Sequence, residues 1–425
     1  MIALVDANNF YVSCERVFDL SLEGRPVAVL SNNDGCVISR SAECKALGIE
    51  MGTPYFKLRP RAASLGLVFR SSNYELYGDI SARIVAVLGT FTPDVEQYSI
   101  DEAFLHLALP ADTDWTRLGT DIRGRVLRWV GVPCGVGFAP TRTLAKIANH
   151  IGKKLPGGVY VMPPDPAPVL RALPIEEVWG VGRRLAERLR RLGVRDAQTF
   201  ATRPPEFFRR HRFAVTVERT ALELRGIPAT DADPLDSEAP HSILVSRMFG
   251  TPVDKLRDIE EALATYASAA AEKLRRNTSV ASAANVFLQE CAPPGTHGWN
   301  DASWWTPFLE AGVVFAAPTA ATPTILDAVL PAAARLFVEG HRYRRAGVML
   351  HGIEPAGSAV DLFSGDPSGT KAARLSAALD AVNARFGRGT VALAAAGTER
   401  AWAMKRDMLS PCPTTRWSDI PVVLA

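Results

Sequence analysis

Short apolar runs and amphipathic helical patterns alternate along the first 160 residues, and this alternation constrains the fold more than any other feature. Runs such as IALVD, RPVAVLS and CGVGFA have the length and composition of buried strands. Such alternation is typical of an α/β domain with one central sheet. The predicted strands cover 2–6, 25–31, 94–99, 102–107 and 134–139. One predicted helix starts near residue 8, and the other predicted helices cover 39–49, 73–91, 115–130 and 141–155. Thr141 is the expected N-cap of the last helix, and the strands 94–99 and 102–107 are expected to pair through a tight connection.

Two proline-containing stretches divide the remaining chain. They cover 162–174 and 227–240, and we expect both to be linkers. Short helices alone are predicted between them. After the second linker the order β-α-β-β-α-β is predicted, which is the ferredoxin-like pattern. Its strands cover 242–249, 282–290, 310–317 and 345–352, its helices cover 254–276 and 323–338, and one more helix follows at 370–387. The expected fold class is therefore multidomain, with α/β and α+β parts.

Composition excludes several classes of protein. The 425 residues are 47% hydrophobic with a net charge of +3, which fits an ordinary globular chain. Arginine is nevertheless concentrated in 183–212. The six cysteines form no CxxC pair, so a zinc site is not expected and a reducing compartment fits best. We see neither a signal peptide nor an apolar run of about 18 residues, so we expect a cytoplasmic protein without a membrane span.

Three acidic residues lie at predicted strand ends. Asp6 ends the first strand, and Asp101 and Glu102 begin another. If these strands are neighbours, three carboxylates converge on one point, where divalent cations would relieve their repulsion. Oxygen ligands favour Mg²⁺, and this arrangement is typical of phosphoryl transfer. An exposed Asp-Glu turn without a metal remains an equal alternative on spacing alone.

Four motifs in one order give the chain a resemblance. They are VDANNFYVSCE, SNNDGCVISRSAECKALGI, YSIDEAFL and GVGFAPTRTLAKIANH. Together they resemble the Y-family translesion DNA polymerases. EVWGVGRR and GHRYRRAGVML further resemble the UmuC branch, the catalytic subunits of DNA polymerase V. The resemblance covers essentially the whole chain.

The resemblance implies a right-hand polymerase fold. The palm would cover 1–165, with a fingers insertion at about 16–75, and the helical thumb with its helix-hairpin-helix would cover 166–235. The little finger would cover 240–353, and a tail would cover 354–425. The implied function is template-directed translesion synthesis in the SOS response to DNA damage. Asp6, Asp101 and Glu102 then correspond to the metal-binding and catalytic acids, which hold two Mg²⁺ ions.

The resemblance also implies contacts with the incoming deoxynucleoside triphosphate. Tyr11 matches the steric gate that excludes a ribose 2′-hydroxyl. Ala42 stands where other branches carry a tyrosine near the triphosphate, which leaves Ser39 and Arg40 as substitutes. The candidate nucleotide-binding residues are Phe10, Tyr11, Ser39, Arg40, Lys45 and Lys153. Without the family, Phe10 and Tyr11 are better explained as core aromatics, and the two lysines as solvated helix residues.

Candidate contacts with primer-template DNA lie in two regions. Glycines in a GVG hairpin let the backbone approach a phosphate, and the arginines after them add charge. A merely solvated arginine-rich face is the alternative. The candidates are Gly180, Gly182, Arg183 and Arg184 in the thumb, and Arg342, Arg344 and Arg345 in the little finger.

The tail carries a candidate for sliding-clamp binding. AVDLF (359–363) keeps the apolar plug of the clamp-binding pattern in Leu362 and Phe363, but Ala359 replaces its usual glutamine. Family resemblance also implies a UmuD′-like dimer and a RecA filament as partners. A two-metal nuclease or cyclase and a non-catalytic DNA-binding or scaffold relative are the competing classes. A scaffold is expected to lose the acids, and a nuclease does not need Tyr11 or the lysines.

Overall fold

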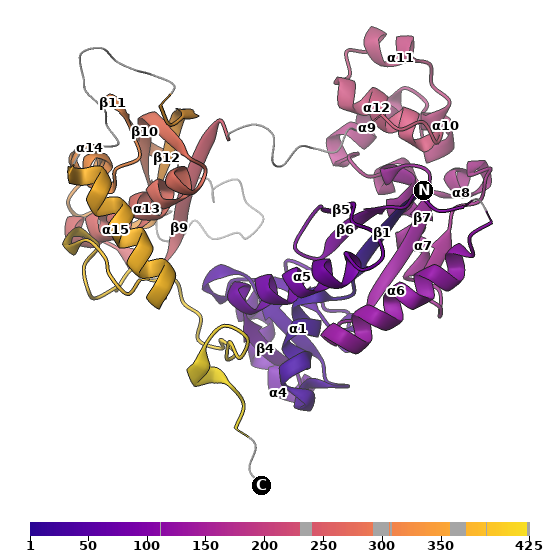
Figure 1. Ribbon diagram of the computed structural model, residues 1–425, viewed down its shortest axis with the longest axis horizontal. Coiled ribbons are helices and arrows are strands. Elements are labelled where there is room, and N and C mark those ends of the chain that lie inside the picture. The colour runs from indigo at the N-terminus through magenta and orange to yellow at the C-terminus, as the bar shows by residue number, and fades with distance from the viewer. Residues whose placement is uncertain are drawn as a thin grey trace. The chain divides into compact units, whose positions relative to one another are not determined.

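The computed structural model describes residues 1–110, 112–229, 240–291, 306, 308–357, 371–387 and 389–422. The chain forms two compact units, each described here by itself (Figure 1). One unit contains Met1–Pro234 together with Asp407–Ala425, and the other contains Leu235–Arg406.

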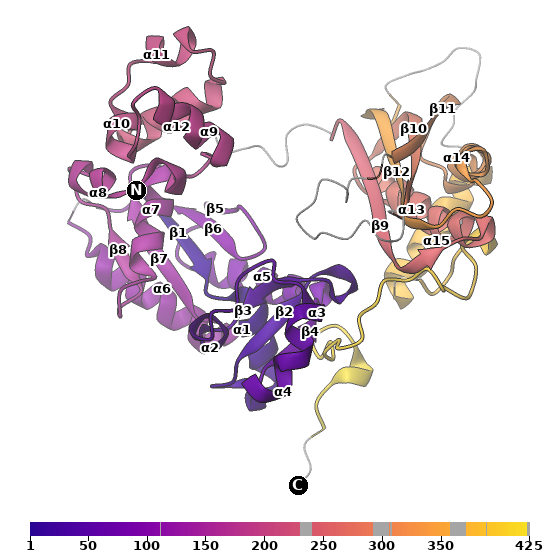
Figure 2. The same ribbon diagram turned by 180° about the vertical axis from the view of Figure 1, so that it is seen from behind.

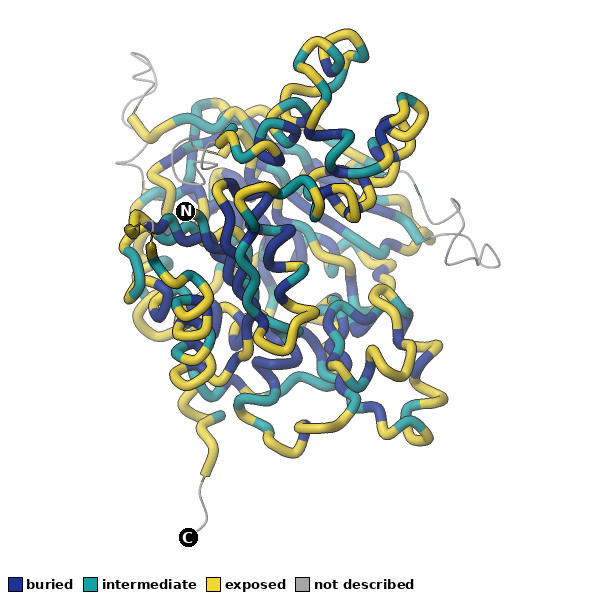
Figure 3. The backbone as a smooth tube through the Cα atoms, turned by 90° about the vertical axis from the view of Figure 1, so that its right-hand side faces the viewer, coloured by how far each residue is buried: buried dark blue, intermediate teal, exposed yellow. Residues whose placement is uncertain are grey.

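A five-stranded sheet is the centre of the first unit, in the order β5-β6-β1-β7-β8. Neighbouring strands are antiparallel except β7 and β8. Alternate residues of β1 serve two cores: Ala3 and Val5 pack in one, and Leu4 packs in the other. Figure 3 colours the backbone by burial, with buried residues in dark blue and exposed residues in yellow, and the burial pattern of the first strand is almost entirely buried or half-buried. The strands are β1 (Ile2–Ala7), β5 (Val95–Gln97), β6 (Glu102–His106), β7 (Cys134–Ala139) and β8 (Val159–Val161).

Four helices cover this sheet. Helices α5 and α6 contribute to the core that contains Ala3 and Val5, whereas α7 contributes to the core that contains Leu4. Thr141 is the N-cap of α7, as predicted, because its side chain accepts a hydrogen bond from the Leu144 N–H. The bounds are α1 (Phe10–Phe18), α5 (Tyr74–Leu88), α6 (Trp115–Val130) and α7 (Arg142–Gly152).

A three-stranded sheet in the order β3-β2-β4 occupies the region expected to be the fingers (Figure 2). The predicted helix over 39–49 is wrong at its start, because Val37–Arg40 pairs with β2 and only Ala42–Ala46 is helical. β4 and β8 were not predicted either. All three missed strands have four residues or fewer, too short for a recognisable period. The elements are β2 (Val27–Leu30), β3 (Val37–Arg40), β4 (Val68–Ser71), α2 (Ala42–Ala46), α3 (Tyr55–Leu58) and α4 (Ala62–Leu65).

Five short helices form the region expected to be the thumb. The predicted linker 162–174 is partly helical, because prolines occupy the start of α8, where a missing N–H is tolerated. Leu170 of α8 is buried in the same core as Leu189 and Phe200. The helices are α8 (Ala167–Ala172), α9 (Arg183–Arg191), α10 (Ala197–Ala201), α11 (Pro205–Arg210) and α12 (Val215–Leu224).

The second unit has the predicted β-α-β-β-α-β order. Its antiparallel sheet has the strand order β11-β10-β12-β9. Helix α15 belongs to this unit, where Arg275 pairs with Asp380 at 2.6 Å. The elements are β9 (Ser242–Val253), α13 (Leu256–Arg276), β10 (Ser279–Glu290), β11 (Phe308–Thr319), α14 (Thr322–Leu336), β12 (Tyr343–Pro355) and α15 (Lys371–Phe386).

The residues expected to form one C-terminal tail are divided between the two units. Helix α15 packs in the second unit, whereas the described residues from Asp407 onward belong to the first. Met408 packs against the core that lies beneath the three-stranded sheet. This docking joins residues more than 300 positions apart in the chain.

Candidate active site

Strand pairing brings the three acids to one end of the central sheet. Asp6 of β1 lies opposite Glu102 of β6 in the antiparallel register. Asp101 precedes β6, and its carbonyl accepts a hydrogen bond from the Ala7 N–H at 2.9 Å. The two strands that carry the acids are therefore neighbours in the sheet, which is the condition stated for bringing the acids together.

Ser99 holds the turn that presents Asp101. Its hydroxyl donates to the Asp101 Oδ1 at 2.5 Å and accepts from the N–H groups of Asp101 and Glu102. A serine that hydrogen-bonds the backbone two and three residues on is a common turn device. The sequence analysis did not single out Ser99, although its place two residues before the acids was a usable signal.

Two lysines lie against the acids. One belongs to α7, and the other directly follows the C-terminal end of this helix. Lys153 Nζ is 2.5 Å from Asp6 Oδ2, and Lys146 Nζ is 2.9 Å from Glu102 Oε2. Gly135 of β7 permits the first contact, because a Cβ there would meet the Lys153 side chain at 3.0 Å. The sequence analysis missed Lys146. Its position seven residues before Lys153, two turns along one helix face, could have revealed it.

The electrostatic surroundings of Asp6 shift its proton equilibrium. Burial is the main reason that the pKa of Asp6 is raised to about 6; Lys153 opposes this shift, and the charges of Glu102 and Asp101 add to it. A carboxylate in this setting gains from any added cation. The surroundings of Asp6 therefore favour a second positively charged partner in addition to Lys153.

A cavity of about 420 Å³ is bordered by the candidate nucleotide-binding residues. All six candidate nucleotide-binding residues line it, together with two of the acids. Its lining includes Asp6, Asp101, Phe10, Tyr11, Ser39, Arg40, Lys45 and Lys153. The sequence thus identified a set of side chains that the fold brings together from four separate segments.

The third acid lines an adjoining space. Glu102, with Lys146 and Trp179, borders a cavity of about 330 Å³ that also reaches Asp6. In the described part of the chain, no three His, Cys, Asp or Glu side chains lie close enough to hold one ion. The expectation that all three carboxylates converge on one point is not met in this structure, in which Asp6 and Glu102 are each paired with a lysine.

The two aromatic candidates differ in their surroundings. Phe10 is only 3% exposed and packs in the core. The alternative that Phe10 is a core aromatic therefore accounts for most of this side chain. Tyr11 is half-buried and lies parallel to Tyr77, with ring centroids 4.6 Å apart and an interplanar angle of 16°. Burial, with smaller effects from Tyr74 and Asp101, raises the pKa of Tyr11 to about 12. Tyr11 is therefore a neutral ring at physiological pH.

Three basic side chains, those of Arg40, Lys45 and Lys153, also line this cavity. Lys45 Nζ donates to Asn9 Oδ1 at 2.6 Å, and the Asn9 backbone is left-handed with a φ of 48°. Burial lowers the pKa of Lys45, and the nearby charges of Arg40 and Lys153 lower it further. Three cations that repel one another in one cavity favour a bound anion. Ser39 is buried beside them, and Arg40 also donates to the Ile49 carbonyl.

The thumb candidates for DNA contact lie on its surface. Gly180 has a φ of +83°, which favours glycine, and Gly182 is the N-cap of α9. Arg183 is 92% exposed and pairs with Glu187, and Arg184 is also exposed. The arginine-rich face is therefore accessible, as phosphate binding requires.

The little-finger candidates are more varied. Arg342 is exposed, whereas Arg344 and Arg345 are half-buried. Arg345 lies over the rings of Phe287 and Phe308 and donates to Ser246 Oγ at 2.8 Å. Part of its role is therefore local packing. The clamp-binding candidates Ala359, Leu362 and Phe363 lie outside the described residues.

Four family models match the chain. The impB/mucB/samB family matches residues 5–150, and the C-terminal domain of the same family matches 240–361. The IMS family HHH motif matches 167–194, which contains α8 and α9. A domain of unknown function (DUF4113) matches 373–423.

Full-length relatives agree with these matches. Protein UmuC of Salmonella typhimurium is 42% identical, and Protein SamB of Salmonella typhimurium is 39% identical, each over 99% of both chains. DNA polymerase IV of Pelotomaculum thermopropionicum is 27% identical over 92% of this chain and 94% of its own.

The fold itself is similar to that of solved Y-family polymerases. A Dbh-Dpo4-Dbh chimera has a TM-score of 0.63 at 21% identity, and the insertion ternary complex of Dbh DNA polymerase has a TM-score of 0.52 at 20% identity. Each match covers 84% of this chain and 100% of the solved chain. With the UmuC relative matching throughout, the chain belongs to the UmuC, ImpB, SamB and MucB family of Y-family translesion DNA polymerases.

Proposed function

We propose that this polymerase adds deoxynucleotides to a primer 3′ end with two Mg²⁺ ions held by Asp6, Asp101 and Glu102. One observation carries the proposal: two of the acids and all six nucleotide candidates line a single cavity of about 420 Å³. A negatively charged edge next to a positively charged wall suits a metal-bound triphosphate.

The residues present fit Mg²⁺. The donors are carboxylate oxygens, the ligands that this ion prefers. The raised pKa of Asp6 and the lysines already paired with Asp6 and Glu102 support a need for cations at this edge. When bound, the ions would lower the pKa of the primer hydroxyl and stabilise charge on the leaving pyrophosphate.

The chain's own side chains would bind and orient the substrate. Lys45 and Lys153 would bind triphosphate oxygens, with Lys153 exchanging Asp6 for a phosphate. Ser39 and Arg40 line the same cavity. One of them would take the place of the tyrosine that is absent at Ala42. Asp6 and Asp101 would hold the reacting end of the nucleotide against the primer.

Tyr11 would set the choice of sugar. Its ring lines the cavity five residues after Asp6 and is backed by Tyr77. A ribose 2′-hydroxyl would meet this ring, whereas a deoxyribose would pack on it. A nuclease has no use for such a surface, and a scaffold has no use for the acids, so the cavity favours the polymerase over both alternatives.

Primer extension with Mg²⁺ tests the metal assignment. Asp6→Ala, Asp101→Ala and Glu102→Ala are each expected to reduce kcat/KM at least about 10²-fold, because several kcal/mol of charge stabilisation is lost. Asp121→Ala, on the exposed face of α6, is the matched control. DNA affinity should stay close to that of the unchanged protein. Near-normal extension by Asp6→Ala and Asp101→Ala would refute the two-metal assignment.

The cellular setting is proposed from the family. The protein would act in the cytoplasm during the SOS response, on primer-template DNA, with a sliding clamp, a UmuD′-like dimer and a RecA filament as partners. Dbh DNA polymerase was solved as an insertion ternary complex, which supports a similar substrate here. In the described part of this chain, no helix has the length and apolarity of a membrane span.

A further inference from the structure

The segment from Asp407 to Asp419 docks on the rest of the first unit, beginning with a reciprocal pair of hydrogen bonds to Ser71. The Met408 N–H donates to Ser71 Oγ, and the Ser71 N–H donates to the Met408 carbonyl, each at 3.0 Å. At the far end of the docked segment, Arg416 pairs with Glu75 at 2.7 Å. The docked segment therefore spans from the end of β4 to the first turn of α5.

Asn73, the N-cap of α5, binds the middle of the docked segment. Its Oδ1 accepts from the Leu76 N–H, which caps the helix. Its Nδ2 donates to the Ser410 carbonyl at 3.1 Å and to the Pro411 carbonyl at 3.2 Å. Asn73 is buried. One amide thus fixes both the start of α5 and the place of Ser410.

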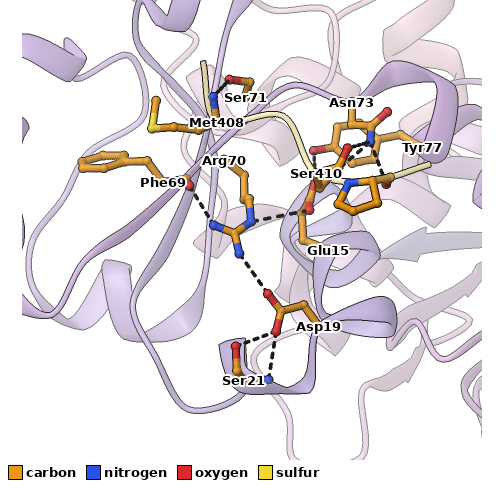
Figure 4. Close-up of polar contacts among 11 residues, drawn as sticks. Glu15, Asp19, Ser21, Phe69, Arg70, Ser71, Asn73, Tyr77, Met408 and Ser410 are labelled. Carbon is orange, nitrogen blue, oxygen red and sulfur yellow. Dashed lines mark hydrogen bonds and ion pairs between the residues drawn. The ribbon is translucent and has the colours of Figure 1, made fainter. Parts of the chain in front are cut away.

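Ser410 reaches a buried carboxylate inside the first unit. Its hydroxyl donates to Glu15 Oε1 at 3.0 Å, and Glu15 is only 2% exposed (Figure 4). The Tyr77 hydroxyl donates to the same oxygen at 2.6 Å. Arg70 approaches the other oxygen at 4.0 Å. Glu15 therefore links the docked segment directly to Tyr77.

Tyr77 in turn supports Tyr11. Its ring is fully buried and lies parallel to that of Tyr11, at a centroid distance of 4.6 Å. Tyr74, one turn earlier on α5, meets the Tyr11 ring edge-on at 5.9 Å. The Tyr11 ring is thus held by α5, the helix whose first turn the docked segment binds.

We propose that the docked segment is a positioning element of the nucleotide site, acting from Ser410 through Glu15 and Tyr77 on the orientation of Tyr11. This inference rests on the proposed role of Tyr11 toward the sugar. It gives a function to part of the region matched only by a domain of unknown function. Ser410, Glu15 and Tyr77 touch no substrate, and their effect is on which sugar is accepted.

The test measures kcat/KM for matched ribo- and deoxynucleotides on the full-length chain. Ser410→Ala and Tyr77→Phe should each lower discrimination against ribonucleotides about two- to tenfold, the factor expected for the lost hydrogen bond to Glu15; Ser410→Ala also removes the hydroxyl that accepts from Asn73 Nδ2 at 3.0 Å. Ser410→Thr keeps the hydroxyl and should restore discrimination. Ser418→Ala removes an exposed hydroxyl of the same segment that bonds only Asp419 in the described contacts, and should change nothing.

Two further measurements separate positioning from general stability. Because both hydroxyls act on one carboxylate, the double variant Ser410→Ala/Tyr77→Phe should show less than the sum of the two single effects. Thermal unfolding gives the melting temperature of each variant. The change in melting temperature should not correlate with the change in the ratio of kcat/KM between deoxynucleotides and ribonucleotides. Additive effects that follow the melting temperature would overturn the proposal.

Tyr11→Ala distinguishes failure of this proposal from failure of its premise. It should lower discrimination by about 10²–10³-fold. If Tyr11→Ala has that effect while Ser410→Ala and Tyr77→Phe leave the ratio unchanged, the positioning role is wrong and the sugar contact stands. If Tyr11→Ala itself leaves the ratio unchanged, the sugar assignment fails and the positioning role fails with it.

Discussion

At the scale of single residues, burial controls the charge of Glu15. Burial raises its pKa above the ordinary value of 4.5, although hydrogen bonds from Tyr77 and Ser410 and the charge of Arg70 oppose the shift. The folded protein therefore binds this proton more tightly than the unfolded chain does. The stability from Glu15 is fully present below pH 4.5 and is lost as pH rises through the raised pKa.

Glu15→Gln should remove this pH dependence, since glutamine keeps an acceptor oxygen but does not titrate. Urea unfolding from about pH 2 to about pH 8 measures it and also covers the acidic range in which the contribution of Asp19 is lost. Asp19→Asn is the opposite control, because the Ser21 hydroxyl and Arg70 lower the pKa of Asp19. Stability from Asp19 is present at high pH and lost as pH falls. If the unfolding free energy of Glu15→Gln changes with pH in parallel with that of the unchanged protein, the raised pKa of Glu15 is contradicted.

At the scale of elements, the approach of α7 to β7 places both lysines. A Cβ on Gly137 would meet the Asn149 backbone nitrogen at 2.1 Å and the Ala145 carbonyl oxygen at 2.6 Å. Gly137→Ala should therefore push α7 from the sheet and destabilise the fold by about 1–3 kcal/mol. Primer extension should fall as well, because Lys146 and Lys153 move with the helix.

Gly124→Ala is the matched control for this prediction. Gly124 lies on the exposed face of α6, and a Cβ added there would have no heavy atom within 4 Å outside its own helix turn. Alanine there should stabilise the protein by up to about 1 kcal/mol through helix propensity. Equal unfolding free energies for the two variants would contradict the close packing of α7 on β7.

Helix α9 gives a second prediction at this scale. Arg184→Ala should weaken binding of all DNA sequences alike and reduce the slope of log affinity against log salt by about 0.9, as expected for one lost phosphate contact. Arg117→Ala, exposed on α6, is the control. Fluorescence anisotropy over a salt series measures both. A changed sequence preference would indicate base contacts instead.

At the scale of the whole molecule, the proposed clamp binding would depend on Leu362 and Phe363, which lie outside the described parts. Leu362→Ala/Phe363→Ala should abolish stimulation by the sliding clamp and spare basal synthesis, because a few apolar anchors commonly dominate such docking. Ala359→Gln should strengthen stimulation. Primer extension with and without clamp measures both effects. Stimulation that survives loss of both side chains would place clamp binding elsewhere.

Most elements of the molecule were predictable from local patterns. The strands β1, β6 and β7 and the helices α5, α6, α13 and α14 have clear periodicity, so local patterns located them and indicated the β-α-β-β-α-β order. The strands β3, β4 and β8 and the helix α8 were missed. Each is so short that its partners stabilise it more than its own residues do.

The sequence by itself determined the chemistry of this protein: three acids at strand ends, a neighbouring tyrosine and lysines from separate segments. Their residue types and spacing are local properties. Only the tertiary structure decided that Lys146 pairs with Glu102 across 44 positions, that Tyr77 binds Glu15 across 62, and that Ser410 joins them across 395. Such contacts have no periodic signal, because packing of separate elements, rather than the order of residues within one, brings the groups together.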